Sequence, residues 1–476
     1  MSMSTPTRIS WTRRVGAALG AAALCHACTL GLPRDLADDS IRAAWIELGP
    51  EGVPIARAIV GGSRCPDIVV DGRAEAMRVR AMPATIPLRP TQSAPADSKP
   101  SAFPVATCEL DLPRTATRAV VGDRALPLPI DAPQRIVVLG DSGCRLKKSD
   151  DVWQRCDNLA TWPFARIAEM AAAQGPDLVI HVGDYHYREN GCPATIPGCA
   201  GSPWGYGFDA WNADFFVPAA PLLASAPWIM VRGNHEECAR AGQGWFRFLD
   251  PYPFETRRSC DDPANDVIAN YSPTYRVPLG RGLQVLVFDS AKVGYDPLAA
   301  TDPQYSAYRT QFEQADALAR TDGVTSIFAN HHPLLAFVPR TGTPPLTGNA
   351  ALQSVAAPLF GTRYFPERVE LAVHGHMHDF QAIGFAAGQP ATLVAGMGGD
   401  VLDVELPDPF PSSLPPAPGT KVNTIAHRAH FGFVLLERGT GTWTITAYGT
   451  DGVPFRRCTL VRRKLDCGSS GLSASN

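Results

Sequence analysis

Residues 179–187 read VIHVGDYHY, and the interpretation of the whole chain starts from them. Their apolar beginning predicts a buried strand, and Asp184 follows that strand in a Gly-Asp turn. Tyr187 stands three residues further on. A carboxylate and a phenol at the end of a buried strand can hold a metal ion, but a core strand closed by a turn aspartate has the same pattern. The residues at the ends of the neighbouring strands distinguish these two interpretations.

A parallel βαβ unit surrounds this stretch. Residues 136–139 (IVVL) form a continuous apolar run, as expected of a strand that is buried on both faces. Residues 162–174 carry apolar side chains at helical spacing, and Gly175-Pro176 ends that helix. Strand, helix and strand in this order predict two parallel strands of an α/β fold. Further strands are predicted at residues 228–231, 283–288, 326–329, 369–373, 391–395, 432–436 and 443–448, and a helix at residues 304–320.

Residues with metal-binding or catalytic side chains follow five of these strands. In an open α/β sheet, ligands bind at the carboxyl edge of the strands. One such strand end could arise by chance, because Asp, Asn and Gly are ordinary turn residues, but five in order predict a site at that edge. The five ends are Asp141-Ser142-Gly143, Gly183-Asp184-Tyr185-His186-Tyr187, Gly233-Asn234-His235-Glu236, Asn330-His331-His332-Pro333 and His374-Gly375-His376-Met377-His378.

The side chains at this edge suit hard or borderline cations, because they are carboxylates, imidazoles, a phenol and an amide without a thiolate. A bridging carboxylate can hold two ions about 3.5–4 Å apart, the arrangement used in two-metal hydrolysis of phosphate esters. His376 and His378 are two residues apart, so an extended chain points both imidazoles to one face. His181 and His186 are expected to be structural or to support the ligands.

The set of motifs resembles the calcineurin-like metallophosphoesterase superfamily, over about half of the chain, and within it the purple acid phosphatase branch. Most members have a histidine two residues after the first aspartate, whereas Gly143 takes that position here and Tyr187 closes the second motif. In the purple enzymes these two departures occur together, because a tyrosinate replaces the missing histidine on a ferric ion. The resemblance implies an α/β metallophosphoesterase-type βαβ sandwich, with two mixed sheets flanked by helices.

The resemblance also implies two metal ions, Fe(III) and a divalent ion of Fe, Zn or Mn, with Asp184 as the bridge between them. The His-x-Pro pattern selects His331 rather than His332 as a ligand, and an exchange of the two stays open. One ion would be held by Asp141, Asp184, Tyr187 and His378, and the other by Asp184, Asn234, His331 and His376.

The implied function is that of an exported phosphatase that hydrolyses phosphomonoesters, small substrates that a metal-bound hydroxide attacks at phosphorus. His235 would donate a proton to the leaving group, or orient the phosphate. A phosphodiesterase or nucleotidase of the same superfamily is an alternative. The aromatic residues of the segment 188–214, among them Trp204 and Trp211, would then line its pocket, or else pack within their own loop. A catalytically idle binding protein is a third alternative, against which the presence of every ligand argues.

A small all-β domain is predicted before the catalytic region. Residues 38–129 show short apolar pieces separated by Gly and Pro, and residues 77–81 alternate apolar and basic side chains. The predicted division is a sandwich-like domain at residues 28–131 and a metallophosphoesterase domain at residues 132–476.

The first 27 residues have the pattern of a signal peptide. Arg13-Arg14 precede an apolar run of ten residues, and Cys25-His26-Ala27 place small residues before a possible cleavage point. A twin-arginine signal and a lipid anchor on Cys28 are further options. No later apolar span is long enough for a transmembrane helix. We therefore expect a secreted or periplasmic protein.

Composition and cysteine usage agree with an exported globular enzyme. The chain has 476 residues with 45% hydrophobic and 19% charged residues. A formal charge of -3 does not favour nucleic acid as the main partner. Ten cysteines lie beyond the N-terminal segment, and an even number in an exported chain suggests disulfides. Pairing of neighbours is expected, as 65–108, 144–156, 192–199, 238–260 and 458–467.

Overall fold

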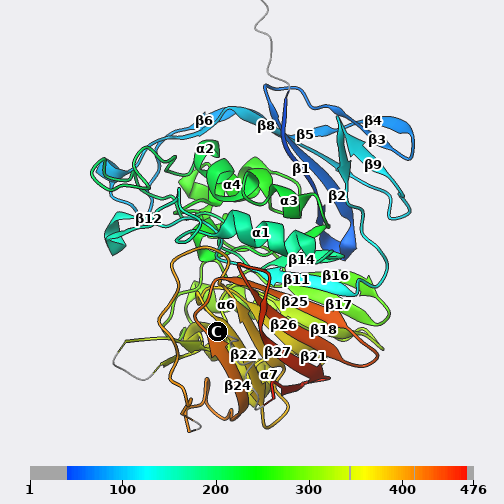
Figure 1. Cartoon of the computed structure of the whole chain (residues 1–476), viewed down its shortest axis with the longest axis vertical. Helices are drawn as coiled ribbons and strands as arrows, with labels where there is room; N and C mark the ends of the chain where they lie inside the picture. Colours follow the sequence, from blue (N-terminus) through cyan, green and yellow to red (C-terminus); the bar gives the residue numbers. More distant parts are fainter. Residues whose placement is uncertain (1–39, 342–344, 412, 469–476) are drawn as a thin grey trace, which may run out of the picture. The chain divides into compact units, whose positions relative to one another are not determined.

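The structure is a computed structural model that describes residues 40–341, 345–411 and 413–468 (Figure 1). The predicted signal peptide at residues 1–27 and the alternative lipid site at Cys28 lie outside the described residues.

An eleven-stranded mixed sheet contains the predicted βαβ unit. Strands β11 (Arg135–Leu139) and β14 (Leu178–His181) are parallel neighbours joined through helix α1 (Phe164–Ala173), and β15 (Trp228–Met230) continues the parallel set. On the other side of β11 the sheet turns antiparallel. That antiparallel part consists of β25 (Gly432–Arg438), β26 (Trp443–Gly449), β27 (Pro454–Val461) and β28 (Lys464–Asp466).

A seven-stranded mixed sheet forms the second half of the sandwich, with the strand order β16-β17-β18-β21-β23-β22-β24. Its parallel centre is β17 (Leu283–Val287), β18 (Thr325–Ala329), β21 (Val369–His374) and β23 (Ala391–Ala395). Antiparallel strands complete it, namely β16 (Tyr275–Gly280), β22 (Phe380–Phe385) and β24 (Val422–Arg428).

The two sheets share one apolar core and carry helices on their outer faces. Ile136 and Val138 of β11 belong to the same buried cluster as Val285 of β17, whereas Val137 and Leu139 belong to the cluster that contains α1. Because successive strand residues point to opposite faces, β11 is buried on both sides, which explains its continuous apolar run. On the outer face of the second sheet lie α6 (Pro303–Ala319) and α7 (Ala350–Phe360). The predicted sandwich of two mixed sheets flanked by helices is confirmed.

Short helices cover the outer face of the larger sheet together with α1, and Figure 1 shows them grouped there. They are α2 (Phe208–Trp211), α3 (Ala220–Leu223) and α4 (Gly242–Phe248), and α5 (Asp266–Ala269) follows along the chain. Two short antiparallel strand pairs contribute residues to the cavity described below. They are β12 (Leu146–Lys147) with β13 (Val152–Trp153), and β19 (Phe337–Val338) with β20 (Leu346–Thr347).

The N-terminal region is rich in strands, and part of it extends the larger sheet. Strand β1 (Ile41–Leu48) pairs in parallel with β15, through Glu47 opposite Trp228. Residues 38–476 cluster as one compact unit, so residue 131 does not coincide with a break between units, and the division there stays a prediction. Beyond β1, the larger sheet continues with β2 (Pro54–Gly61), β8 (Val105–Asp111) and β5 (Arg78–Ala81). A separate four-stranded sheet consists of β10 (Arg124–Leu126), β9 (Ala119–Val121), β3 (Asp67–Val70) and β4 (Arg73–Ala76). A third, two-stranded sheet pairs β6 (Ala84–Ile86) with β7 (Ser101–Phe103).

Five disulfides join the ten cysteines as neighbours, as predicted. They are Cys65–Cys108, Cys144–Cys156, Cys192–Cys199, Cys238–Cys260 and Cys458–Cys467. Among the residues that the structure covers, no helix combines the length and the apolar character that a membrane span needs.

Candidate metal centre

The ends of five parallel strands bring the predicted ligands together. Asp141 follows β11, Asp184 follows β14, and His376 follows β21. All three have positive φ angles, of 56°, 61° and 72°. Non-glycine residues adopt this left-handed conformation uncommonly, and such strain is concentrated at functional sites. The chain turns sharply at each strand end, and the side chain is thereby directed into a shared space.

The first group of ligand atoms surrounds the hydroxyl of Tyr187. This oxygen lies 3.0 Å from Oδ1 of Asp141, 2.9 Å from Oδ2 of Asp184 and 3.1 Å from Nε2 of His378. A phenol has one proton to donate, so it can satisfy one of these three acceptors. Four acceptor atoms that converge in this way fit a cation bound among them.

The second group is built around the side-chain oxygen of Asn234. It lies 2.9 Å from Nε2 of His331 and 3.1 Å from Nδ1 of His376. Nε2 of His331 is also 3.2 Å from Oδ2 of Asp184, the same carboxylate oxygen that faces Tyr187. Asp184 therefore stands between the two groups, as a bridging ligand would.

Outer hydrogen bonds orient two of the imidazoles. Nδ1 of His331 donates to the carbonyl of Val182 at 2.8 Å, and Nδ1 of His378 donates to the carbonyl of Val401 at 2.7 Å. Each bond directs Nε2 of its ring toward the carboxylates, the orientation in which metal-binding histidines are held.

The ionisation of these groups also fits a cation site. Burial alone would lower the pKa of His331, but the charge of Asp184 and a hydrogen bond to it raise this pKa to about 9. Burial raises the pKa of Tyr187 well above its ordinary value, and the charges of Asp141 and Asp184 add to the effect. A proton thus substitutes for the positive charge that a metal ion would bring to the same atoms.

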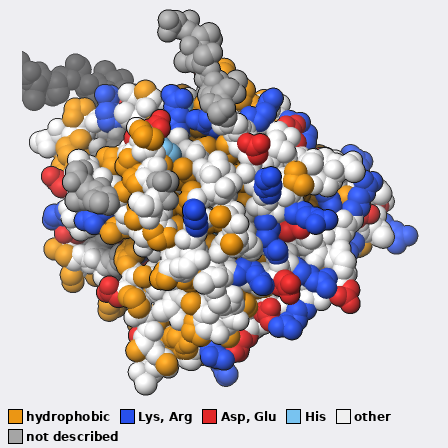
Figure 2. All heavy atoms as spheres, turned by 90° about the horizontal axis from the view of Figure 1, so that it is seen from below, with side chains coloured by type: hydrophobic (Ala, Val, Ile, Leu, Met, Phe, Trp, Pro, Cys, Tyr) orange, Lys and Arg blue, Asp and Glu red, His pale blue; other side chains and the backbone are white. Residues whose placement is uncertain are grey.

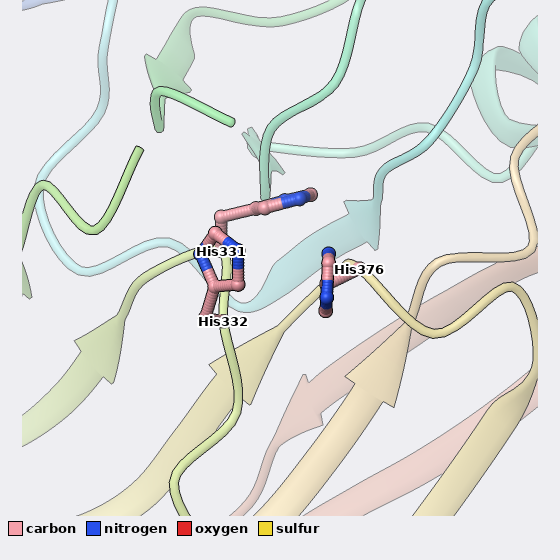
Figure 3. Close-up of side chains that lie close together, drawn as sticks. All are labelled: His331, His332 and His376. Atoms are coloured by element: carbon pink, nitrogen blue, oxygen red, sulfur yellow. The ribbon is translucent and has the colours of Figure 1, made fainter. Parts of the chain in front are cut away.

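One further imidazole, that of His332, adjoins the second group. Figure 3 shows His331, His332 and His376 side by side at the ends of β18 and β21, and one nitrogen of each lies within 4.8 Å of the others. The ring of His332 is 4.2 Å from that of His376, and its Nδ1 is 3.2 Å from the hydroxyl of Ser290. His331 in addition groups with Asp141 and Asp184. The selection of His331 as the ligand stays a prediction that this second grouping favours.

Gly143 and Tyr187 depend on each other sterically. A Cβ atom on Gly143 would lie 2.8 Å from the amide nitrogen of Tyr187 and 2.9 Å from Cδ2 of its ring. It would also lie 2.9 Å from a carboxylate oxygen of Asp214. The backbone and ring of Tyr187 and the carboxylate of Asp214 therefore leave no room for a side chain at position 143, which fits the presence of glycine there.

His235 lies against the first group, within the same cavity. Its ring centroid is 3.8 Å from that of Tyr187, and its Nε2 is 3.8 Å from Oδ2 of Asp184. Nδ1 lies 3.2 Å from a carboxylate oxygen of Glu189, and Arg240 contacts both the imidazole and Glu189. Burial and Arg240 lower the pKa of His235 to about 4.

Two buried carboxylates that the sequence did not single out support the strand ends. Glu236 accepts backbone N–H groups of Gly233, Asp184 and Tyr185 at 2.9–3.0 Å. Asp214 accepts the N–H of Tyr187 at 2.8 Å. Glu236 stands next to His235 in the quoted motif and could have been found there, whereas nothing near Asp214 in the sequence marks it.

A cavity of about 990 Å³ opens over the ligands. Tyr187, Asn234, His235, His376 and His378 line it, together with residues of the β19–β20 hairpin and Tyr295. The four aromatic residues of the segment 188–214 do not line it. Tyr206, Phe208 and Trp211 are buried in the core beneath the helices, and Trp204 packs against Lys99. The interpretation that these aromatic residues line the pocket is therefore wrong, and three of them pack into the core between the larger sheet and its helices rather than within their own loop.

Known proteins share both the family and the fold. Residues 134–380 match the calcineurin-like phosphoesterase family. No curated protein matches the chain significantly. The fold is similar to that of purple acid phosphatase PPD1 from yellow lupin (Lupinus luteus), with a TM-score of 0.55 and 15% identity over 90% of this chain and 77% of that one. It is also similar to PhoD, with a TM-score of 0.51 and 10% identity over 91% of this chain and 93% of that one.

The family match covers more than half of the chain, and the strand ends that carry the ligand side chains lie within it. The chain belongs to the calcineurin-like phosphoesterase family and is a metal-dependent phosphoric ester hydrolase.

Proposed function

We propose that this protein is an exported, acid phosphatase-like enzyme that hydrolyses phosphomonoesters at a two-metal centre. Its ligands would be those expected from the sequence, with Asp184 shared. One ion is assigned to Asp141, Asp184, Tyr187 and His378, and the other to Asp184, Asn234, His331 and His376. The assigned metals are Fe(III) and a divalent ion of Fe, Zn or Mn.

One observation carries the proposal, the convergence of the Tyr187 hydroxyl with the carboxylates of Asp141 and Asp184 at 2.9–3.0 Å. The neutral phenol has one proton and can donate it to only one of the two buried carboxylates, so the oxygens left without a donor suit a bound cation. Burial and both charges keep the phenol protonated until such a cation offsets them. The fit of Gly143 beside the tyrosine supports the same assignment to the purple type.

The residues around the phosphate position have separable tasks. The bound ions would supply Lewis acidity toward the phosphoryl oxygens and lower the pKa of the attacking water. His235 is assigned to protonate the leaving oxygen, from the cavity side of the first ligand group, and its lowered pKa of about 4 restricts this role to acidic pH. Glu189 and Arg240 hold the imidazole between them and limit its rotation.

The disulfides support export, since five such bonds are typical of an oxidising compartment. Expression of the full-length chain, followed by assay of the medium and of the periplasmic fraction for the mature protein, distinguishes a secreted from a periplasmic protein.

The metal-loaded enzyme tests the proposal with three esters, 4-nitrophenyl phosphate, bis(4-nitrophenyl) phosphate and glycerol 2-phosphate. We expect kcat/KM for the monoester to exceed that for the diester by about ten-fold or more. His235→Asn should lower kcat about 100-fold for glycerol 2-phosphate, whose alkoxide needs a proton, and much less for 4-nitrophenyl phosphate. His427→Asn is the control. His427 lies on β24, where its ring pairs with Glu405, and this variant should retain activity.

Each alternative has its own outcome in this experiment. A faster diester reaction would replace the proposal with a phosphodiesterase. A protein that holds its metals and hydrolyses none of the three esters would be an idle binding protein. Equal losses for both monoesters in His235→Asn would contradict the assignment of proton donation to His235.

A further inference from the structure

The catalytic cavity has an apolar wall that phosphate hydrolysis itself does not require. Tyr295 belongs to this wall, and its hydroxyl lies 3.2 Å from Nε2 of His376 while its ring centroid is 5.9 Å from the imidazole. The aromatic ring therefore stands directly beside the ligand side chains. Two thirds of the tyrosine is nevertheless exposed.

The β19–β20 hairpin continues this wall. Val338 and Leu346 are direct partners across the two strands, and both line the cavity. Side chains of directly paired residues project from the same face of a hairpin, so these two form one apolar surface. Leu346 is 49% exposed. Tyr295, Val338 and Leu346 together are named here the apolar wall.

More apolar surface adjoins the cavity on the side of His378. Val401 and Val404 are exposed, and they flank Asp403, which lines the cavity. Figure 2 shows that hydrophobic side chains gather over one half of the displayed face, whereas Lys and Arg gather over the other. Large apolar groups that stay in contact with water are stabilised when a ligand covers them, and contiguous groups of this kind mark binding sites.

The cavity is large enough to hold an occupant much larger than phosphate. Its volume of about 990 Å³ is at the upper end of the range for small-molecule sites, so most of it is available to the leaving group. The lysines and arginines that line the cavity are already paired with carboxylates. Lys147 pairs with Asp150 at 3.2 Å, and Lys292 pairs with Glu237 at 2.5 Å. These two lysines therefore offer no unpaired positive charge to a leaving group that carries several further anionic charges.

We infer that the preferred substrates are phosphomonoesters of a bulky aromatic or otherwise apolar alcohol, whose leaving group lies against the apolar wall. This inference rests on the proposed function and specifies its substrate class. In the reaction, the bond from phosphorus to the leaving oxygen breaks and a bond from a water oxygen to phosphorus forms. One proton of that water balances the leaving oxygen, and the products are the free alcohol and inorganic phosphate.

Phenyl phosphate and 2-naphthyl phosphate test the inference, because their phenols have similar acidities and differ mainly in apolar area. We expect kcat/KM to favour the naphthyl ester about ten-fold in the wild type, which corresponds to ~1.4 kcal/mol. Leu346→Ser and Tyr295→Leu should each reduce this ratio, and the double variant should bring it near one. Tyr295→Phe keeps the ring and should keep the ratio. Leu159→Ser removes a leucine of similar exposure that does not line the cavity, and it should leave both activity and ratio unchanged.

Calorimetry with 2-naphthylphosphonate and phenylphosphonate gives a readout that does not depend on turnover. The naphthyl compound should bind more tightly and with a more negative heat-capacity change, the signature of buried apolar surface. The double variant should lose this difference while it still binds inorganic phosphate.

The outcomes separate the two claims. Hydrolysis of both esters at equal kcat/KM, with equal binding of both phosphonates, would overturn the inference and leave the proposed function standing. An unchanged ratio in the double variant would likewise overturn it, because the preference would then come from another surface. A loaded protein that hydrolyses neither ester and binds no inorganic phosphate would overturn the proposed function itself.

Discussion

Gly143 illustrates how a single missing side chain shapes the site. The space that a Cβ would need is taken by the backbone and ring of Tyr187 and by the carboxylate of Asp214. These neighbours are fixed, because Asp214 accepts the N–H of Tyr187 and both residues are buried. Any side chain at position 143 must therefore displace Tyr187 or Asp214.

Gly143→Ala should reduce the free energy of unfolding by about 1–3 kcal/mol, the usual cost of overpacking a filled core. Tyr187 should also move away from the carboxylates and weaken metal binding. Denaturant unfolding of the metal-free protein measures the first effect, and metal titration the second. Gly294→Ala is the matched control, because its Cβ would meet no atom within 4 Å. Equal stability of the two variants would contradict the steric argument.

Residue types and spacing sufficed to select the side chains that the structure brings together, because each stands directly after a predicted strand. Tyr295 and Asp214 escaped notice for the opposite reason. Tyr295 lies on a connecting segment and Asp214 on a short π-helix (Asn212–Phe216), and only the folded chain places them beside His376 and Tyr187. Their roles depend on contacts between residues distant in the sequence, which no local pattern contains.

At the scale of elements, the disulfides act on segments of very different length. Cys65–Cys108 spans 43 residues and Cys192–Cys199 spans 7. In the chain-entropy description, a disulfide restricts the unfolded chain more strongly when it closes a longer loop. Cys65 lies between β2 and β3 and bonds to Cys108 of β8, whereas Cys192 and Cys199 both lie in the segment between β14 and α2.

Replacing both cysteines of a pair by serine compares the two bonds. Loss of Cys65–Cys108 should reduce the free energy of unfolding by about 1.6 kcal/mol more than loss of Cys192–Cys199, from the ratio of the two loop lengths. Equilibrium unfolding in urea of the two double variants measures this difference. A larger loss for the short loop would show that the bonds act through the native structure rather than through the unfolded chain.

Long periodic segments were predicted with nearly their observed bounds, among them α1, α6 and the parallel strands of both sheets. Their burial repeats along the sequence, so the pattern is local. The β12–β13 and β19–β20 hairpins were not predicted, because two-residue strands carry no periodicity. The pairing of the two sheets into one sandwich came from the resemblance of the motifs, and the shared core confirms it.

At the scale of the whole molecule, Glu47 marks the junction between the N-terminal strands and the catalytic sheet. It stands opposite Trp228 where β1 meets β15, and its carboxyl group lies 2.9 Å from the guanidinium of Arg57, with both side chains fully buried. Burial raises the pKa of Glu47 from 4.5 to about 8, although Arg57 and Arg80 oppose the shift. The prediction of a separate domain here rests on short apolar pieces separated by Gly and Pro, and a buried acid between two sheet regions leaves no local signature in the sequence.

The pH dependence of stability follows from this shift. Between pH 4.5 and about 8 the folded protein holds a proton on Glu47 that the unfolded chain has lost. The stabilisation is therefore complete below pH 4.5 and is lost as the pH rises toward 8, with a slope of at most about 1.4 kcal/mol per pH unit. Glu47→Gln should flatten this decline in denaturant unfolding, whereas Glu313→Gln on the exposed face of α6 should not. An unchanged slope in Glu47→Gln would assign the dependence to another group.

The metal content of the purified protein, measured by elemental analysis together with its visible spectrum, tests the central claim most directly. We predict two metal ions per chain, one of them iron, and a visible absorption band that disappears in Tyr187→Phe while the iron is retained. A phosphatase that is fully active without bound metal would contradict the two-metal centre. An iron-free, colourless and fully active metalloenzyme would contradict the assignment of Tyr187 to a ferric ion.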